Sequence, residues 1–332
     1  MSKVKEKLLI LLESRRGSFV SGQDIADDFG VSRTAVSKAA DQLRADGYSI
    51  ESRQNLGYRL SEDNDIINDC NLRPALKYNP DRALCIYREI DSTNTALKRM
   101  AQEGAADRTV VIAESQTAGR GRQGKSFFSP AGSGLYMSLL VRPEDGLPFD
   151  CVTMLTVLAG VAAAEAVRVL FDIDARIKWV NDIYCNGKKL CGILTEATLD
   201  AEMRSVSSAV IGIGINVRRT AFPPELADIA CAVEDFSDES DVKKSALAAE
   251  ILNRIDGYLN ELCSSDGKHR LISKYRTLSC VIGEEITFMC EGVLHNARAI
   301  GIDEDGALII QYDNSTREAL NSGEISIRVG QS

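Results

Sequence analysis

The chain has 332 residues, 44% of them apolar and 26% charged, which is the composition of an ordinary soluble globular protein. This length predicts two or three domains. Nine cysteines without CxxC spacing and only two histidines, His269 and His295, argue against a disulfide framework, a zinc site or a Cys-His nucleophile. We therefore expect free thiols in a reducing cytoplasm and no protein-bound metal site.

Neither a signal peptide nor a membrane span is predicted. The N-terminus lacks a cationic segment followed by an apolar stretch. The longest apolar stretch, Val152 to Val167, is interrupted by Thr153, Thr156 and Glu165, and it is shorter than the ~20 residues that cross a bilayer. It predicts a buried, alanine-rich helix, and we expect no membrane partner.

The net charge of −9 is unevenly distributed along the chain. Residues 1–61 contain 10 lysines and arginines against 8 acidic residues, a net charge of +2, so the remainder carries −11. A mildly basic N-terminal region on an acidic body allows DNA binding that is restricted to that region.

Residues 1–62 have the pattern of a winged helix-turn-helix domain. A first helix ends near Gly17, Ser21 is placed to cap a second, and Gly30 precedes Ser32, which is placed to cap a third. The apolar residues expected to face the core of these helices are Val4, Leu8, Leu11, Ile25, Ala26, Phe29, Val36, Ala39, Ala40 and Leu43.

The third helix and the hairpin that follows it are expected to contact DNA. Two helices joined by a glycine-containing turn place the second helix in the major groove. Alternation from Tyr48 to Ser52, and again from Tyr58 to Leu60, predicts a two-stranded wing. The predicted DNA-binding residues are Ser32, Arg33, Thr34, Ser37, Lys38, Arg53 and Arg59. A three-helix fold that binds another protein is the alternative.

Two further domains are predicted beyond the polar linker Ser61 to Asn64. Residues 66–270 alternate between strand-like and helical segments, which indicates an α/β domain. Its expected strands are Leu84–Tyr87, Thr109–Ala113, Leu135–Val141, Ile177–Trp179 and Val210–Ile215, and its expected helices cover 93–103, 153–170 and 243–262. Residues 278–332 contain short strands and glycine turns, which predicts a small SH3-like β-barrel. The predicted fold class is multidomain α+β.

Residues Gly119 to Ser126, with the sequence GRGRQGKS, match two nucleotide-binding patterns, the Walker A motif and GxGxxG. Both patterns require a helix directly afterwards, because its N-terminus binds the phosphate. Pro130 and the glycines after it break any helix here, so we predict that both matches are coincidental and that the protein is not a P-loop ATPase. Arg120 and Arg122, placed between glycines, still suit a phosphate ligand.

Four other motifs accompany this loop. Asp91-Ser92-Thr93-Asn94 opens a predicted helix, and taken alone it is equally typical of helix capping. Lys178-Trp179-Val180-Asn181-Asp182 precedes a hairpin whose turn is Asn186-Gly187. Lys189 to Gly192 and Gly212 to Asn216 lie on strands. In this order, together with Gln116 and the winged helix-turn-helix, they resemble the bifunctional biotin protein ligase and biotin operon repressor family over nearly the whole chain.

The resemblance implies a reaction in which biotin and ATP form biotinyl-5′-adenylate and biotin then passes to a lysine of a biotin carboxyl carrier protein. It also implies Mg²⁺ on the pyrophosphate, operator DNA as a partner, and an adenylate-bound homodimer in which the adenylate is corepressor. The implied biotin contacts are Ser92, Thr93, Asn94, Gln116, Arg120, Gly121, Arg122, Lys189 and Gly192. The implied ATP and adenylate contacts are Arg120, Arg122, Lys178, Asp182 and Asn216.

Lys189 and Arg122 are the expected catalytic residues. Joining a carboxylate to an α-phosphate brings two anions together, so the reaction needs preorganised cations more than a protein nucleophile. The chain departs from the family pattern at two places. Val180 stands where proline is expected, and without proline the turn is predicted to be less rigid. Ser126 and Phe127 stand where the family often has a basic residue and tryptophan. The segment that covers adenine is expected near Arg218 to Phe222.

Two rival functions differ in class. A lipoate or octanoate ligase would show an Arg-Arg and triple-glycine segment followed by His-Asp, and the chain has none. A biotin-sensing repressor with a non-catalytic ligase domain would not need the phosphate-facing Lys189, Arg120 and Arg122.

Overall fold

The computed structural model of the protein describes residues 3–142, 151–200, 205–237, 243–262, 264–290 and 292–327. The chain divides into two compact units. The first comprises residues 1–75 with 243–246, and the second comprises residues 76–242 with 247–332. The last five residues of the predicted C-terminal domain lie outside the described ranges.

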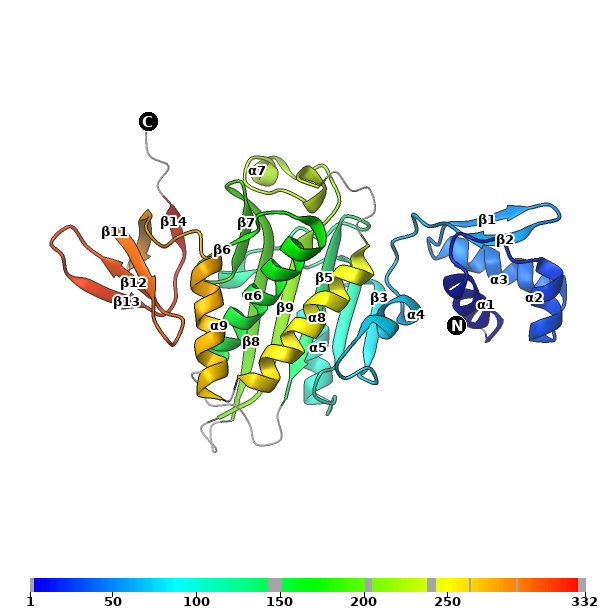
Figure 1. Ribbon diagram of the computed structural model, residues 1–332, viewed down its shortest axis with the longest axis horizontal. Helices are drawn as coiled ribbons and strands as arrows, with labels where there is room; N and C mark the ends of the chain where they lie inside the picture. Colours follow the sequence, from blue (N-terminus) through cyan, green and yellow to red (C-terminus); the bar gives the residue numbers. More distant parts are fainter. Residues whose placement is uncertain are drawn as a thin grey trace. The chain divides into compact units, whose positions relative to one another are not determined.

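The first unit is a winged helix-turn-helix, as predicted (Figure 1). Its helices are α1 (Lys3–Ser14), α2 (Gly22–Phe29) and α3 (Arg33–Ala45), and the wing is the antiparallel pair β1 (Ile50–Arg53) and β2 (Gly57–Leu60). Ser21 caps α2 by accepting hydrogen bonds from the backbone N–H groups of Gln23 and Asp24, and Ser32 caps α3 in the same way. Gly30 ends α2 in the left-handed conformation, with φ of 64°.

The core of this unit matches the prediction for α3, and for α2 at Ile25 and Ala26, while the predicted Phe29 is only half-buried and α1 differs. In α3 the buried residues are Val36, Ala39, Ala40 and Leu43. In α1 they are Leu8, Leu9 and Leu12, while Val4 and Leu11 are only half-buried. The buried face of α1 is therefore rotated from the predicted one. A short helix that was not predicted, α4 (Asp69–Leu72), follows the wing, and Asn68 caps it.

The centre of the second unit is a seven-stranded sheet. Its strands are β3 (Leu84–Ile90), β4 (Val110–Gln116), β5 (Gly134–Val141), β6 (Arg176–Lys178), β7 (Asp182–Cys185), β8 (Lys188–Asp200) and β9 (Ser205–Asn216). Their order is β3-β4-β5-β9-β8-β7-β6, and of these pairs only β3-β4 is parallel.

Helices cover both faces of this sheet. Helix α5 (Thr93–Gln102) packs on the face that carries Val210, and α6 (Cys151–Phe171) packs on the other, where Thr156 bonds Thr195 at 2.8 Å. Because side chains alternate along a strand, Gly192, Gly212 and Gly214 lie on the α5 face. The remaining helices are α7 (Pro224–Ala227), α8 (Lys244–Glu261), α9 (Ser265–Leu278) and the 3₁₀ turns Arg73–Ala75, Arg122–Gly124 and Val233–Asp235.

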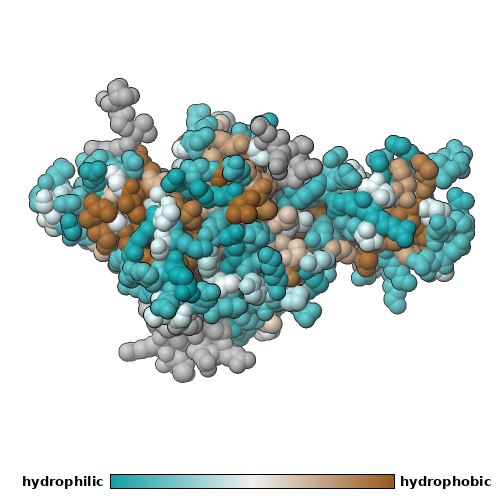
Figure 2. Space-filling model, viewed as in Figure 1, coloured by the Kyte–Doolittle hydropathy of each residue, from teal (hydrophilic) through white to brown (hydrophobic). Residues whose placement is uncertain are grey.

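Helix α6 is the predicted alanine-rich core helix. Its segment Thr153–Phe171 is long and apolar enough to cross a membrane, but 67% of its apolar window is buried inside the fold. Glu165 of α6 connects this helix to α8 and α9. Its carboxylate accepts hydrogen bonds from Arg254 and Tyr258 of α8 and from Lys274 of α9. The surface over α8 and α9 is largely hydrophilic in Figure 2.

The C-terminal segment is a five-stranded antiparallel sheet, which confirms the predicted small all-β domain. Its strands are β10 (Glu285–Cys290), β11 (Val293–Ile302), β12 (Leu308–Gln311), β13 (Arg317–Leu320) and β14 (Ile325–Ile327), in the order β13-β12-β11-β10-β14. The indole Nε1 of Trp179 donates to the carbonyl of Gly306 at 2.9 Å. The seven cysteines whose side chains the structure describes are free thiols.

Candidate functional site

A cavity of about 350 Å³ lies on the α5 face of the central sheet. Gly192, Gly212 and Gly214 form part of its floor. A Cβ at Gly212 would lie 2.1 Å from Oδ1 of Asn94, and one at Gly214 would lie 2.6 Å from the ring of Phe127. These glycines therefore allow the two side chains to lie directly against the sheet.

One end of the cavity is lined by buried polar groups at the N-terminus of α5. Ser92 caps the helix, and its Oγ accepts from the Thr95 N–H at 3.4 Å. Gln116, at the end of β4, uses Oε1 to accept from the N–H of Thr93 at 2.9 Å and from its hydroxyl at 3.2 Å. Its Nε2 donates to Ser129 at 2.8 Å. These groups are preorganised hydrogen-bonding partners for a small polar ligand.

Asn94 completes this polar end. Its Nδ2 donates to the Leu194 carbonyl and to Glu196, both at 3.1 Å, and its Oδ1 accepts from Ser138 at 2.6 Å. Asn94 is 4% exposed, so its side chain contacts these partners and the cavity and has almost no contact with solvent elsewhere.

The Gly-Arg loop, residues Gly119 to Ser126, borders the cavity. It contains only a 3₁₀ turn, Arg122–Gly124, and no helix lies between Ser126 and the start of β5 at Gly134. This confirms the prediction that the Walker A match is coincidental. A Cβ at Gly119 would lie 2.3 Å from the carbonyl oxygen of Phe127, so glycine is required there.

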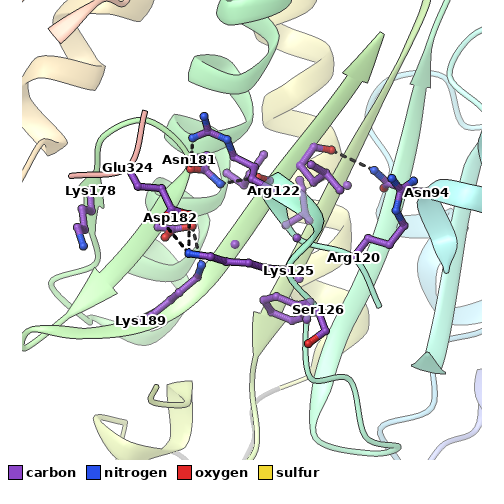
Figure 3. Close-up of a pocket in the computed structure, with 18 of the residues that line it drawn as sticks. Asn94, Arg120, Arg122, Lys125, Ser126, Lys178, Asn181, Asp182, Lys189 and Glu324 are labelled. Carbon is purple, nitrogen blue, oxygen red and sulfur yellow. Dashed lines mark hydrogen bonds and ion pairs between the residues drawn. The ribbon is translucent and has the colours of Figure 1, made fainter. Parts of the chain in front are cut away.

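The other end of the cavity is strongly charged (Figure 3). Nζ of Lys189 lies 2.8 Å from Oδ1 of Asp182, and Nζ of Lys125 lies 2.7 Å from Oε1 of Glu324. Nζ of Lys178 lies 4.8 Å from the centre of the Tyr184 ring, and burial lowers the pKa of this amine although Asp182 opposes the shift. Cations of this kind suit phosphate and carboxylate groups.

The two arginines of the Gly-Arg loop, Arg120 and Arg122, are held by different partners. Arg120 forms an ion pair with Glu196 at 3.0 Å. Arg122 donates to Oδ1 of Asn181 at 2.9 Å and to the carbonyl of Gly323 at 3.5 Å. Sequence reasoning missed Gly323 to Ser326 as part of the cavity wall, because no local pattern marks a strand about 200 residues away.

An apolar wall is formed by Leu226 and Ile229, at and after α7. The backbone of this segment pairs with Lys189, whose N–H donates to Ile229 at 2.7 Å and whose carbonyl accepts from Cys231 at 2.9 Å. Residues 218–222, which were expected to cover the nucleotide, do not line the cavity, and Phe222 packs against Phe128 instead.

Most of the predicted ligand residues meet in this one cavity. They are Ser92, Thr93, Asn94, Gln116, Arg120, Gly121, Arg122, Lys178, Asp182, Lys189 and Gly192. Asn216 does not line the cavity. Its Nδ2 donates to the carbonyl of Cys231 at 3.0 Å. The peptide bond between Trp179 and Val180 is cis.

The first unit carries the predicted DNA-binding surface. Arg33, Thr34 and Lys38 are exposed on α3, and Ser37 is half-exposed. On the wing, Arg53 and Arg59 lie over the ring of Phe19, at 5.2 and 4.8 Å from its centre. Both also pair with Glu51, and the Arg59 contact is the shorter at 2.5 Å. The charge that the wing offers to DNA is therefore partly neutralised within the protein.

Comparison with known proteins supports three successive segments. Residues 4–59 match a helix-turn-helix domain family, residues 86–216 match the biotin/lipoate A/B protein ligase family, and residues 281–328 match the biotin protein ligase C-terminal domain. The segment that lines the polar end of the cavity thus falls in the ligase match.

Relatives and solved structures agree with these matches. The chain is 36% identical to the bifunctional ligase/repressor BirA of Bacillus spizizenii over 96% of this chain and 97% of that protein. It is 31% identical to the protein of the same name from Escherichia coli, over 97% and 96% of the two chains. The structure resembles a biotin protein ligase from Aquifex aeolicus solved with biotin and ATP, with a TM-score of 0.63 and 28% identity over 75% of this chain and 99% of that one. The chain therefore belongs to the biotin/lipoate protein ligase family, as one of its bifunctional ligase/repressors.

Proposed function

We propose that this protein activates biotin with ATP to biotinyl-5′-adenylate, transfers biotin to a lysine of a carrier protein, and represses genes of biotin metabolism. The observation that carries the proposal is the cavity itself. It places a polar end, formed by Ser92, Thr93, Asn94 and Gln116, next to an end that holds Lys178 and Lys189. A ligand with a polar ring at one end and a carboxylate at the other fits this arrangement.

The polar end suits the ureido ring of biotin. That ring offers two N–H donors and one carbonyl acceptor. The cavity provides complementary groups, the acceptor Oδ1 of Asn94 and the hydroxyl of Ser92. Because these groups are buried and already oriented, they lose little freedom when the ligand binds.

The charged end suits the chemistry of adenylation. Lys189 is positioned to neutralise the biotin carboxylate and the α-phosphate as they approach each other, and Arg122 adds a second cation from the loop. The apolar wall of Leu226 and Ile229, which is 56% exposed at Ile229, offers a surface on which adenine can lie. In the second step the acceptor lysine attacks an already activated anhydride, so the protein mainly positions the two reactants.

Magnesium would bind together with ATP. Within the described residues no group of three or more His, Cys, Asp or Glu side chains is placed to hold a metal ion. Mg²⁺ in nucleotide sites is usually held by one or two carboxylates with phosphate and water oxygens. Asp182 and Glu324 line the cavity and fit that role. When bound, the ion would neutralise charge on the pyrophosphate.

Biotin-dependent exchange of pyrophosphate into ATP tests the enzyme. The wild-type protein should catalyse exchange, and Lys189→Ala and Arg122→Ala should each lose a factor of about 100 or more, as expected for removal of a transition-state cation. Lys188→Ala removes the same charge next to Lys189 but outside this cavity, and it should keep the wild-type rate. Exchange with lipoate or octanoate and not with biotin would favour the rival ligase, and no exchange would reject both.

The repressor activity is proposed to depend on the adenylate. Biotinyl-5′-adenylate would order the Gly-Arg loop and favour a homodimer whose two α3 helices and wings read an inverted repeat. In a reducing cytoplasm, to which the free thiols are suited, repression would follow only when carrier protein no longer consumes the adenylate. Duplexes selected from a random DNA library should bind more tightly with biotin plus ATP than without them. Equal binding in both conditions would contradict this regulation.

A further inference from the structure

Glu196 lies behind the polar end of the cavity, on the same face of β8 as Gly192. Its side chain is 16% exposed. The carboxylate accepts from Lys98 at 2.9 Å and from Arg120 and Nδ2 of Asn94, both at 3.1 Å. One side chain that does not line the cavity thus joins α5, β8 and the Gly-Arg loop.

Glu196 and the Leu194 carbonyl together fix the orientation of the Asn94 amide. An amide group has two hydrogens on nitrogen and none on oxygen, and an ionised carboxylate can only accept hydrogen bonds. Only Nδ2 can therefore point toward Glu196, and its two hydrogens are used by Glu196 and the Leu194 carbonyl. Oδ1 then lies over Gly212 on the cavity floor. Figure 3 shows Asn94 beside Arg120.

Glu196 remains charged at neutral pH. Burial acts to raise the pKa of this carboxyl group, but hydrogen bonds from Lys98 and Asn94 and the charges of Lys98 and Arg120 outweigh it and hold the pKa below its usual range. A neutral carboxyl group could donate a proton to Oδ1 and would remove one of the two contacts that oppose a turned amide. The two cations therefore keep Glu196 in the form that orients Asn94.

We propose that Glu196 is a positioning residue that makes the cavity selective for ligands with an N–H donor at the polar end, because it holds Asn94 with its oxygen toward the ligand. The inference rests on the proposed function, since the ureido ring of biotin supplies such a donor. It concerns selectivity, and it assigns to Glu196 no contact with the ligand.

Calorimetric titration with biotin, and with biotin methylated on one or the other ureido nitrogen, tests the inference. The ratio of the two affinities measures how strongly the protein reads an N–H group, and it does not depend on the fraction of protein that is folded. Wild-type protein should prefer biotin to one of the methylated analogues by tenfold or more. Glu196→Gln keeps the shape but can also donate to Oδ1, so only the Leu194 carbonyl still opposes a turned Asn94 amide, and the preference should fall about tenfold.

Two control variants separate orientation from stability. Lys98→Gln removes one ion pair of Glu196 and leaves its contacts with Asn94 and Arg120, so it should keep the wild-type ratio even if the protein melts at a lower temperature. Ser138→Ala removes the hydroxyl that donates to Oδ1 and should also keep the ratio, because Glu196 and the Leu194 carbonyl still orient the amide. This variant decides the question if Glu196→Gln does not fold.

The outcomes are distinguishable. An unchanged ratio in Glu196→Gln, or an equal loss of the ratio in Lys98→Gln or Ser138→Ala, overturns the inference and leaves the proposed function standing. A wild-type protein that does not bind biotin overturns the proposed function, and the inference with it.

Discussion

Replacing Gly212 with alanine should damage the polar end of the cavity selectively. The added methyl would lie 2.1 Å from Oδ1 of Asn94, so the two atoms must separate by about 1.3 Å to reach the 3.4 Å of ordinary contact. Asn94 makes three hydrogen bonds, with Leu194, Glu196 and Ser138, and a shift of that size breaks at least two of them. At about 1 kcal/mol each, the loss is about 2 to 3 kcal/mol.

Biotin can use Asn94 only when its side chain is returned to the wild-type position against the added methyl, so this free energy is subtracted from binding and should weaken it by a factor of about 30 to 150. Isothermal titration calorimetry on the ligand-free protein measures it directly. Gly160→Ala is the matched control, because a methyl at that buried glycine meets no atom closer than 3.7 Å and should leave the affinity for biotin unchanged. A Gly212→Ala protein that binds biotin within threefold of the wild type would refute the assignment of Asn94 to the ligand site.

Three further variants test other parts of the structure. Asp256→Asn removes a fully buried carboxylate that pairs with Arg82 and Arg108, and it should cost about 3 to 5 kcal/mol in thermal unfolding. Glu165→Gln should cost about 2 kcal/mol at neutral pH. Burial acts to raise the pKa of Glu165, but its hydrogen bonds with Lys274 and Tyr258 and the charges of Lys274 and Arg254 outweigh burial and hold the pKa below its usual range. The stability difference between the two proteins should therefore shrink once the pH falls below about 4.3 and vanish below the lowered pKa of the folded protein. Ile229→Ser should raise the KM for ATP and leave the KM for biotin unchanged.

Local patterns predicted the elements whose residues lie close together in sequence. The buried set of α3 and the break after Ser126 both follow from periodicity or from proline and glycine over a few residues. The predicted ligand residues of the cavity were found because each belongs to a short motif. Their meeting in one cavity was implied by the family resemblance and not by spacing.

Long-range contacts could not be predicted in the same way. Glu324 reaches Lys125, and Glu196 reaches Asn94, across about 200 and 100 residues, and neither acidic residue stands in a motif. Helix α9 escaped prediction because its first six residues are polar, charged or glycine, and its buried apolar side chains begin only at Leu271. The segment expected to cover adenine, near residues 218–222, stays a prediction, and Ile229 was missed because an exposed isoleucine is normally no signal of a site.

Mass spectrometry of the released ligand tests the central claim most directly. The protein is incubated with biotin, ATP and Mg²⁺ in the absence of a carrier protein, freed of unbound ligand, and then denatured. About one equivalent of biotinyl-5′-adenylate should be released from the wild-type protein and little from Lys189→Ala. Release of only unmodified biotin and ATP from the wild-type protein would contradict the claim that this cavity joins the two.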